Sequence, residues 1–272
     1  MEKLFVIKIG GNVIDNDFTL QSFLSSYAAI TAKKILIHGG GKVATKIGEQ
    51  LGIESKYING RRITDEATID LVTMVYGGLV NKKIVAKLQA LNCNAIGLTG
   101  ADANIIPATK RPLQYTHLRH GDGGGIDYGF AGDIKTENIN AAFLEVLLQQ
   151  NITPVIAPLT HDGKGQILNT NADTIASSLA IALSKNYDVR LIYCFEKKGI
   201  LENMDDGNSV INLITKEKYN ELLANKKLFD GILPKIDNAF AAIDNGVSEV
   251  LIGDAKDLLQ NLTEHTAGTL IQ

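Results

Sequence analysis

Short apolar runs alternate with amphipathic segments along the whole chain. Runs rich in β-branched residues predict strands at 4–9, 34–38, 95–98, 153–157, 189–195, 249–252 and 269–271. Between these runs, apolar residues recur at helical spacing, which predicts helices at 18–30, 42–51, 65–76, 81–91, 171–184 and 213–224, with further helical stripes over 139–147 and 236–247. Asp17 is the expected N-cap of the first helix.

This alternation predicts an α/β fold of three αβα layers, in which helices cover both faces of a central, mainly parallel, twisted sheet. Two segments of the N-terminal part depart from the alternation. Residues 56–64 predict a β-hairpin that turns at Asn59-Gly60. The polar, glycine-containing segment 111–133 predicts further hairpins and a loop. We expect a lobe boundary near residue 170, with lobes of residues 1–170 and 171–272.

Composition describes a globular protein and excludes several other classes. Of 272 residues, 45% are hydrophobic and 21% are charged, which is the balance of an ordinary folded protein. With 26 glycines and only 5 prolines, the chain is neither collagen-like nor a low-complexity disordered sequence. A net charge of −3 gives no general attraction to nucleic acid. Two cysteines without paired spacing, and the lack of an apolar run of about 20 residues, favour the cytoplasm.

Glycine clusters follow two of the predicted strands. Gly10-Gly11 comes directly after the first strand, Gly39-Gly40-Gly41 comes after the second, and a single Gly100 follows a later one. Glycine lets backbone N–H groups approach an anion closely, and the carboxyl ends of parallel strands meet at one edge of a sheet. One such pair is explained by a tight turn alone, whereas two clusters at one edge favour phosphate binding. The clusters match neither a Walker P-loop nor the dinucleotide-binding fingerprint.

Three charged residues occupy positions for which both a structural and a functional role must be considered. Lys8 interrupts the apolar first strand, so it either reaches the surface along its stem or points into a site, and both readings stay open. Asp173 lies in the first turn of a helix capped by Asn171, which is ordinary helix chemistry unless the carboxylate also positions cations. Lys235 opens another helix, where the helix dipole disfavours a cation, and this local violation indicates function.

Five motifs, spread in order over nearly the whole chain, resemble those of N-acetylglutamate kinases, which belong to the amino acid kinase superfamily. These motifs are Lys8-Ile9-Gly10-Gly11, His38-Gly39-Gly40-Gly41, Asn59-Gly60-Arg61-Arg62-Ile63-Thr64, Asn169-Thr170-Asn171-Ala172-Asp173 and Asp230-Gly231-Ile232-Leu233-Pro234-Lys235. The first and the last are shared widely in the superfamily. The third and the fourth are more particular to N-acetylglutamate kinases, so the combination is specific.

The resemblance implies an ATP-dependent enzyme, working with Mg²⁺, that phosphorylates the γ-carboxylate of N-acetyl-L-glutamate in arginine biosynthesis. It implies that residues 1–170 bind the acylated amino acid and residues 171–272 bind the nucleotide. Lys8 and Lys235 would stabilise the transferring phosphoryl group, and Asp173 would hold both lysines in place. The remaining implied residues are Gly39, Gly40, Arg62 and Asn169 for the acceptor and Gly10, Gly11, Glu196, Gly199, Leu201, Lys227 and Phe229 for the nucleotide.

The implied reaction needs no general base, because a glutamate carboxylate is already ionised at pH 7. The obstacle is to bring an anionic nucleophile to an anionic triphosphate, so catalysis rests on positioning and charge stabilisation. Lysines and glycine amides supply such stabilisation. Arg62 suits a bidentate contact with the substrate α-carboxylate better than a lysine would.

Two departures from the family pattern leave alternatives open. Phe195-Glu196 stands where family members commonly have Ser/Thr-Asp, which changes the surroundings of the nucleotide. The segment 117–132 is unusual near the expected acyl group, so N-succinyl-L-glutamate is an alternative acceptor. Glutamate 5-kinase, aspartokinase and a non-catalytic nucleotide-binding regulatory module are further alternatives. The first strand starts almost at Met1, without the helix that joins arginine-inhibited hexamers, so we expect a homodimer without arginine feedback.

Overall fold

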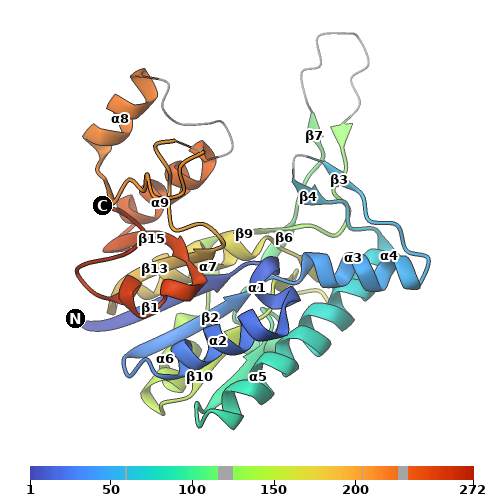
Figure 1. Ribbon diagram of the computed structural model, residues 1–272. Coiled ribbons are helices and arrows are strands. Elements are labelled where there is room, and N and C mark those ends of the chain that lie inside the picture. Colours follow the sequence, from blue (N-terminus) through green and yellow to red (C-terminus); the bar gives the residue numbers. More distant parts are fainter. Residues whose placement is uncertain (59, 116–124, 204, 226–231) are drawn as a thin grey trace.

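The computed structural model spans residues 1–272 and describes residues 1–58, 60–115, 125–203, 205–225 and 232–272. An eight-stranded sheet forms the centre (Figure 1). In sheet order its strands are β14 (Leu213–Ile214), β16 (Thr269–Ile271), β15 (Glu249–Asp254), β13 (Tyr187–Phe195), β1 (Glu2–Ile9), β2 (Lys33–His38), β10 (Thr153–Ile156) and β5 (Ala95–Leu98). Every neighbouring pair is parallel except β15 and β16. The predicted α/β fold with a mainly parallel sheet is therefore confirmed.

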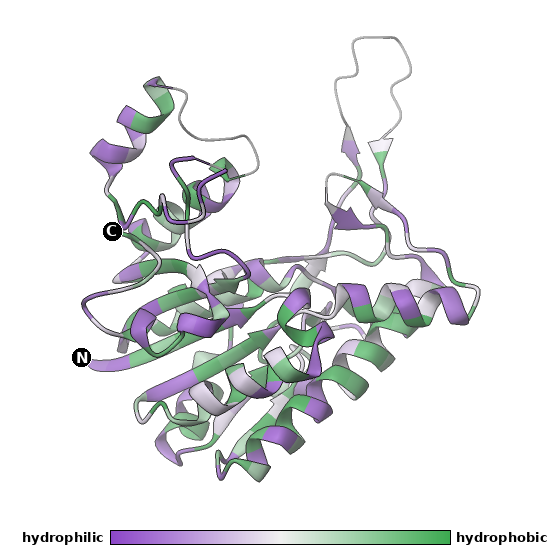
Figure 2. Cartoon of the chain, in the orientation of Figure 1, coloured by the Kyte–Doolittle hydropathy of each residue, from purple (hydrophilic) through white to green (hydrophobic). Residues whose placement is uncertain are grey.

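Helices pack on both faces of this sheet. Those of one layer are α6 (Ala141–Gln149), α7 (Ala172–Leu183), α8 (Lys216–Ala224) and α9 (Leu233–Asp244), and those of the other are α1 (Gly11–Asp15), α2 (Asp17–Ala28), α3 (Gly41–Gln50), α4 (Glu66–Val72) and α5 (Asn81–Ala90). Leu4 and Val6 face the first layer and Phe5 and Ile7 the second, because successive strand residues point to opposite faces. Figure 2 shows the resulting concentration of hydrophobic residues along the strands.

The two halves of the sheet come from different parts of the sequence. Strands that precede residue 170 form the half β1-β2-β10-β5, and strands that follow it form the half β14-β16-β15-β13. The halves join where β1 pairs with β13 over the whole length of β1, from Glu2 opposite Tyr187 to Ile9 opposite Cys194. The carboxyl ends of β1, β2 and β13 consequently meet at one edge.

In the part of the chain that the structure describes, four antiparallel strand pairs stand outside the central sheet. They are β3 (Tyr57–Ile58) with β4 (Arg61–Arg62), β6 (Ala108–Lys110) with β9 (Gly132–Ile134), β7 (Gln114–Tyr115) with β8 (Gly125–Ile126) and β11 (Leu159–His161) with β12 (Ile167–Asn169). The β3–β4 pair falls in the segment 56–64 and the β7–β8 pair in the segment 111–133, where hairpins are predicted, whereas β6 lies before the second segment. Gly60 adopts a left-handed φ of +73°, which glycine takes without strain. The β11–β12 hairpin is not predicted, because each of its strands has only three residues and neither shows a pattern of alternation.

The predicted helices 65–76 and 81–91 are joined rather than separate. A π-helical segment, Thr73–Val80, connects α4 directly to α5, although Gly77-Gly78 resembles a turn. Gly77 lies so close to the β11 strand that an added Cβ would come within 3.3 Å of a Leu159 methyl group. Close packing therefore explains this glycine, and the helix continues through it.

Other boundaries shift for identifiable reasons. Asn16, not Asp17, is the N-cap of α2, because its side-chain oxygen accepts a hydrogen bond from the Thr19 amide at 2.9 Å. The predicted helix 213–224 begins as strand β14, and Thr215 then caps α8. No helix in the part of the chain that the structure describes is long and apolar enough to cross a membrane.

Candidate active site

Lys8 and Asp173 form a partly buried ion pair at the carboxyl edge of the sheet. The Lys8 Nζ lies 2.7 Å from the Asp173 Oδ1, and Lys8 is only 8% exposed. Lys8 shares the face of β1 that packs against α7, and Asp173 lies in the first turn of α7. The side chain of Lys8 therefore points inward to a partner instead of reaching the surface. Asn171 accepts hydrogen bonds from the amides of Asp173 and Thr174, so it caps the helix and leaves the Asp173 carboxylate available to cations.

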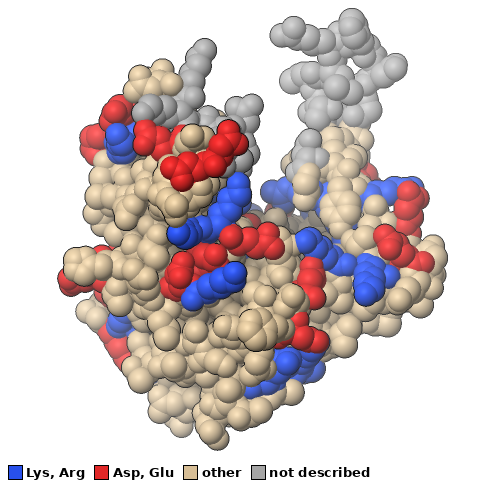
Figure 3. All heavy atoms as spheres, viewed as in Figure 1, with Lys and Arg blue, Asp and Glu red and all other residues tan. Residues whose placement is uncertain are grey.

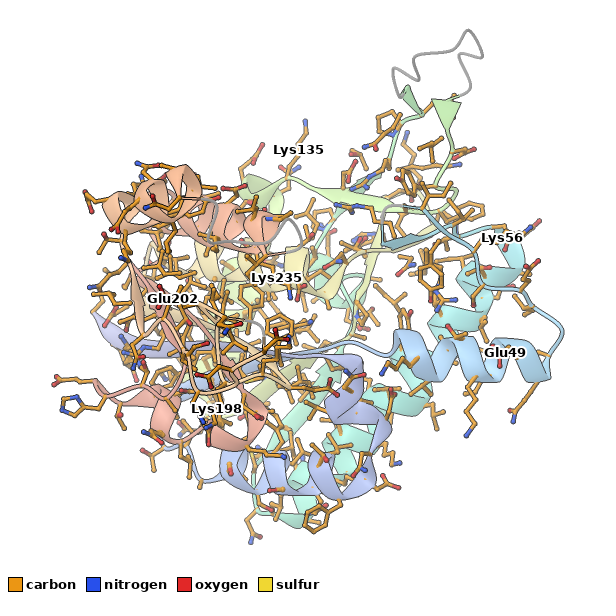
Figure 4. All side chains as sticks on the ribbon, turned by 45° about the horizontal axis from the view of Figure 1, so that its top comes forward. Glu49, Lys56, Lys135, Lys198, Glu202 and Lys235 are labelled. Carbon is orange, nitrogen blue, oxygen red and sulfur yellow. The ribbon has the colours of Figure 1, made fainter. Side chains whose placement is uncertain are left out.

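Lys235 joins this pair from the first turn of α9. Its Nζ lies 4.0 Å from the centroid of the Phe195 ring, and the Lys8 Nζ lies 5.2 Å from the same centroid. Burial lowers the pKa of Lys235 from its ordinary value, the charge of Asp173 opposes that change, and the charge of Lys8 adds to it. Figure 4 shows Lys235 near the middle of the molecule, away from Glu49 on α3 and from Lys56. The structure thus brings Lys8, Asp173 and Lys235 together.

The two glycine clusters abut at the same edge. The Gly39 amide donates a hydrogen bond to the Ile9 carbonyl at 3.1 Å, and a Cβ added to Gly39 would lie 3.7 Å from the Gly11 amide nitrogen. An added Cβ on Gly40 would lie 2.8 Å from the Tyr76 ring, so no larger residue fits there without displacement of the ring. Gly100, by contrast, packs under Leu159, whose carbonyl would lie 2.8 Å from a Cβ. This third glycine is explained by packing.

His38 supports the second glycine cluster from beneath. It is fully buried, its Nδ1 lies 2.6 Å from the Gly39 carbonyl oxygen, and its Nε2 accepts a hydrogen bond from the Asn81 amide at 3.1 Å. These partners define a neutral ring whose Nδ1–H donates to Gly39. Burial lowers the pKa of His38 from 6.5 to about 4. A neutral imidazole thus holds the loop in place at physiological pH.

Two adjoining cavities open at this edge. The larger cavity, of about 570 Å³, is lined by residues that include Lys8, Gly10, Gly11, Glu196 and Lys235. The smaller cavity, of about 200 Å³, is lined by residues that include Arg62 and Asn169. Gly39, Gly40, Gly41 and Tyr57 line both. Figure 3 shows the corresponding hollow between the C-terminal half and the β3–β4 side, with Lys and Arg side chains at its rim.

Arg62 is held rigidly in the smaller cavity by neutral partners. Its Nη2 donates to the Gly41 carbonyl and to the Thr45 hydroxyl, each at 2.9 Å, and also to the Tyr57 hydroxyl. Its Nη1 donates to the Ser55 hydroxyl. Its guanidinium carbon lies 4.8 Å from the centroid of the Tyr57 ring. Because none of these partners carries a charge, Arg62 presents a full positive charge that a carboxylate can neutralise.

Asn169 and two further arginines complete the smaller cavity. The Asn169 amide donates to the Thr64 hydroxyl at 3.0 Å, which orients it from the end of β12. Arg61 and Arg111 also line this cavity, and Arg111 is paired with Asp133 through an Nε–Oδ1 contact of 2.9 Å. Nothing in its local sequence pattern separates Arg111 from an ordinary surface arginine, so the sequence does not predict its place in this cavity.

The remaining predicted nucleotide residues are not all at the larger cavity. Glu196 lines it. Leu201 is buried, and an added Cβ on Gly199 would lie 2.7 Å from the Thr269 hydroxyl, so both are packed against other parts of the C-terminal half. Lys227 and Phe229 lie outside the described residues. No group of three or more His, Cys, Asp or Glu side chains within the described ranges is arranged to hold a metal ion.

Aromatic residues of the site are the main features that the sequence does not reveal. Tyr76 lines the smaller cavity from the π-helical segment, and Tyr57 lies between the two cavities. Phe195 contacts both lysines, although the sequence marks it only as a departure from a family pattern. No sequence signal points to Tyr76, because its orientation depends on the unexpected π-helical turn.

The parallel order of the strands, the glycine loops at their carboxyl edge and the paired lysines define a phosphotransferase of the amino acid kinase class. The model of the amino acid kinase family matches residues 3–254, and the chain belongs to this family. It is 54% identical over 270 residues to the acetylglutamate kinase of Cytophaga hutchinsonii, with 99% of this chain and 98% of that protein covered.

Solved structures support the same fold. The protein smu.665 of Streptococcus mutans UA159 superposes with a TM-score of 0.73 at 29% identity, and the match covers 99% of this chain and 98% of that one. The N-acetylglutamate synthase of Neisseria gonorrhoeae, solved with coenzyme A and N-acetyl-glutamate, has a TM-score of 0.78 at 23% identity. That match covers 99% of this chain and 59% of the synthase, and it bears on the fold alone.

Proposed function

We propose that the protein transfers the γ-phosphoryl group of ATP to the γ-carboxylate of N-acetyl-L-glutamate, a step of arginine biosynthesis. The observation that carries this proposal is the cluster of Lys8, Asp173 and Lys235 beside two cavities that share one glycine loop. The larger cavity has the cationic and amide groups that a triphosphate needs. The smaller cavity has Arg62, whose hydrogen-bond partners are all uncharged, to bind an acidic acceptor. The name of the relative from Cytophaga hutchinsonii agrees with this assignment.

In this mechanism, residues already in place stabilise the negative charge of the reacting groups. The γ-carboxylate attacks the γ-phosphorus of ATP, and ADP leaves on the opposite side. Lys8 and Lys235 stabilise the charge on the transferring group, while Asp173 keeps the two ammonium groups near each other. Gly10, Gly11 and the shared loop offer backbone amides to the phosphates. The pre-formed hydrogen bonds of the loop spare the reaction any reorganisation.

Mg²⁺ is proposed to enter with the nucleotide. In kinases this ion is held by substrate phosphates with one or two carboxylates, and it keeps several waters. Glu196 lines the larger cavity and offers a carboxylate of this kind. When bound, the ion neutralises phosphate charge, which adds to the work of the two lysines.

The acceptor is proposed to bind through Arg62 and Asn169. Arg62 pairs with the α-carboxylate, and Asn169 contacts the amide of the acyl group. A free amino acid would bring an ammonium group into a cavity lined by three guanidinium groups, Arg61, Arg62 and Arg111. Acylation removes that charge, so an acylated glutamate fits better than the free substrates of glutamate 5-kinase or aspartokinase.

N-succinyl-L-glutamate is a second candidate acceptor, favoured by one observation. Arg61 and Arg111 add positive charge to the same cavity as Arg62, and Asp133, which is hydrogen-bonded to Arg111, is a single carboxylate beside these two arginines. A succinyl group carries a terminal carboxylate that such charge would attract. Assays with both acceptors at matched concentrations separate the two candidates.

The proposal extends to organisation. Residues 1–170 form the acceptor lobe and residues 171–272 the nucleotide lobe of a cytoplasmic homodimer. Met74 and Leu79, both more than half exposed on the π-helical segment, are apolar side chains of the kind that a symmetric interface covers. Light scattering after size exclusion tests the dimer, and a hexamer or a monomer would contradict it.

The test of the function is to trap the acyl phosphate. The protein is incubated with Mg·ATP and hydroxylamine, and hydroxamate is measured with N-acetylglutamate, N-succinylglutamate, glutamate and aspartate in parallel. We expect hydroxamate with an acylated glutamate, its loss in Lys8→Ala, and its retention in the matched exposed-lysine control Lys164→Ala. Absence of product with both acylated glutamates would overturn the proposal.

A further inference from the structure

One aromatic ring contacts both lysines of the cluster. Phe195, the last residue of β13, has the Lys235 Nζ 4.0 Å and the Lys8 Nζ 5.2 Å from its ring centroid. Both distances fall within the roughly 6 Å at which the negative face of a ring attracts a cation. The ring is half-buried, so water screens this attraction less than at an open surface.

A second aromatic residue of the same strand, Tyr193, contacts both the Phe195 ring and the Asp173 backbone. Tyr193 and Phe195 are two positions apart, so their side chains share one face of β13. Their rings stack with centroids 6.3 Å apart and an interplanar angle of 24°. The buried Tyr193 hydroxyl donates to the Asp173 backbone carbonyl at 3.3 Å. One strand thereby contacts all three charged residues of the cluster.

The cluster needs a stabilising group besides Asp173. Among the described residues, Asp173 is the carboxylate whose charge acts on Lys235, and the Lys8 Nζ already lies 2.7 Å from its Oδ1. The charge of Lys8 disfavours the charged form of Lys235, in addition to the effect of burial. A ring face attracts cations without a hydrogen-bond requirement, so it can hold an ammonium group whose N–H donors stay free for phosphate oxygens.

We propose that Phe195 is a positioning residue for phosphoryl transfer, whose ring face holds the ammonium groups of Lys235 and Lys8 beside the transferred group. This inference rests on the proposed kinase function. It assigns a role to the residue that stands where the family commonly has Ser or Thr. The ring acts through the two lysines, so it should affect the chemical step more than the binding of either substrate.

Ring fluorination tests this role, because it weakens the negative face of the ring while the shape is nearly unchanged. Phe195 is replaced in the full-length protein by mono-, di- and trifluorophenylalanine, with Phe195→Tyr and Phe195→Leu alongside. We expect kcat to fall stepwise with fluorine number, by about threefold to thirtyfold in all, while the KM of the acylated glutamate is unchanged. Tyrosine should restore most of the rate, and leucine should not. Trifluorophenylalanine at Phe23, a buried core residue distant in sequence, is the matched control.

A measurement without catalysis separates this inference from the proposed function. With lysine labelled by ¹³C at Cε, NMR titration follows the pKa of Lys235 in the same fluorinated series. The pKa should fall with each fluorine, because the ammonium loses attraction while its burial stays constant. If neither kcat nor this pKa changes along the series, the inference is wrong. If the wild-type protein transfers no phosphoryl group, the proposed function fails, and the pKa series alone decides whether the ring holds the lysine.

Discussion

The buried histidine beneath the glycine loop makes the stability of the protein depend on pH in a defined window. His38 has a pKa of about 4 in the folded protein, against 6.5 as the ordinary value. Between these two pH values His38 is protonated in the unfolded chain but not in the folded protein. The free energy of unfolding therefore falls as the pH decreases from about 6.5 toward 4. Above this window, and below it, His38 contributes no further slope.

The magnitude follows from the two pKa values. A difference of about 2.5 units corresponds to about 3 kcal/mol of unfolding free energy over the full window. By pH 5 the loss relative to pH 7.5 should already be about 2 kcal/mol. Carboxylates such as Asp188 and Glu249 have pKa values below their ordinary ones, so their own contributions are lost at lower pH.

Urea unfolding at a series of pH values between 7.5 and 5 measures this slope directly. The matched variant is His38→Asn, whose side-chain amide can still donate to the Gly39 carbonyl but does not titrate. The wild-type protein should lose about 2 kcal/mol more than the variant over this range. Equal slopes in the two proteins would refute the assignment of a buried, neutral His38.

Three further predictions concern single residues. Asp173→Asn should lower kcat by about a hundredfold in the hydroxamate assay, because the two lysines lose their shared counter-charge; a normal kcat would contradict its role. Arg62→Lys should raise the KM of the acylated glutamate by about tenfold or more at constant kcat, through loss of the bidentate contact. An unchanged KM would show that Arg62 does not bind the acceptor. Gly129→Ala should lower the free energy of unfolding, measured with urea, by about 1–3 kcal/mol more than Gly163→Ala does. Both glycines have a left-handed φ, so the strain of that conformation is common to the two variants. Only at Gly129 would the added Cβ collide with backbone, because it would lie 2.1 Å from the Thr64 carbonyl oxygen. Equal costs would mean that the β8–β9 connection yields to the methyl group.

The central sheet can be predicted because its long strands contain apolar runs, Leu4–Ile7 in β1 and Leu191–Phe195 in β13. A strand buried on both faces needs no alternation, so such runs are enough to indicate it. The same logic made Lys8 conspicuous, since a lysine in such a run requires a partner. Which partner it takes was not derivable locally, because Asp173 lies 165 positions away and reaches Lys8 through the packing of α7 on β1.

Features that depend on tertiary contacts were hidden. The π-helical turn over Thr73–Val80 joins two predicted helices, and it is this turn that carries Tyr76 to the glycine loop. Phe195 looks like one more apolar strand residue, and its contact with Lys235 depends on where α9 begins. A local sequence pattern depends on residues that are close along the chain, so it does not predict contacts between distant elements.

The central claim is that a substrate carboxylate attacks the γ-phosphorus of ATP at the Lys8–Asp173–Lys235 cluster. It is tested most directly with N-acetylglutamate that carries ¹⁸O in the γ-carboxylate. Attack forms a bond from a labelled oxygen to phosphorus, and hydroxylamine then displaces phosphate from the carbonyl carbon, so the bridging oxygen leaves with the phosphate. ³¹P NMR should show inorganic phosphate with one ¹⁸O, and this signal should vanish in Lys8→Ala. Unlabelled phosphate from the wild-type protein would contradict the account.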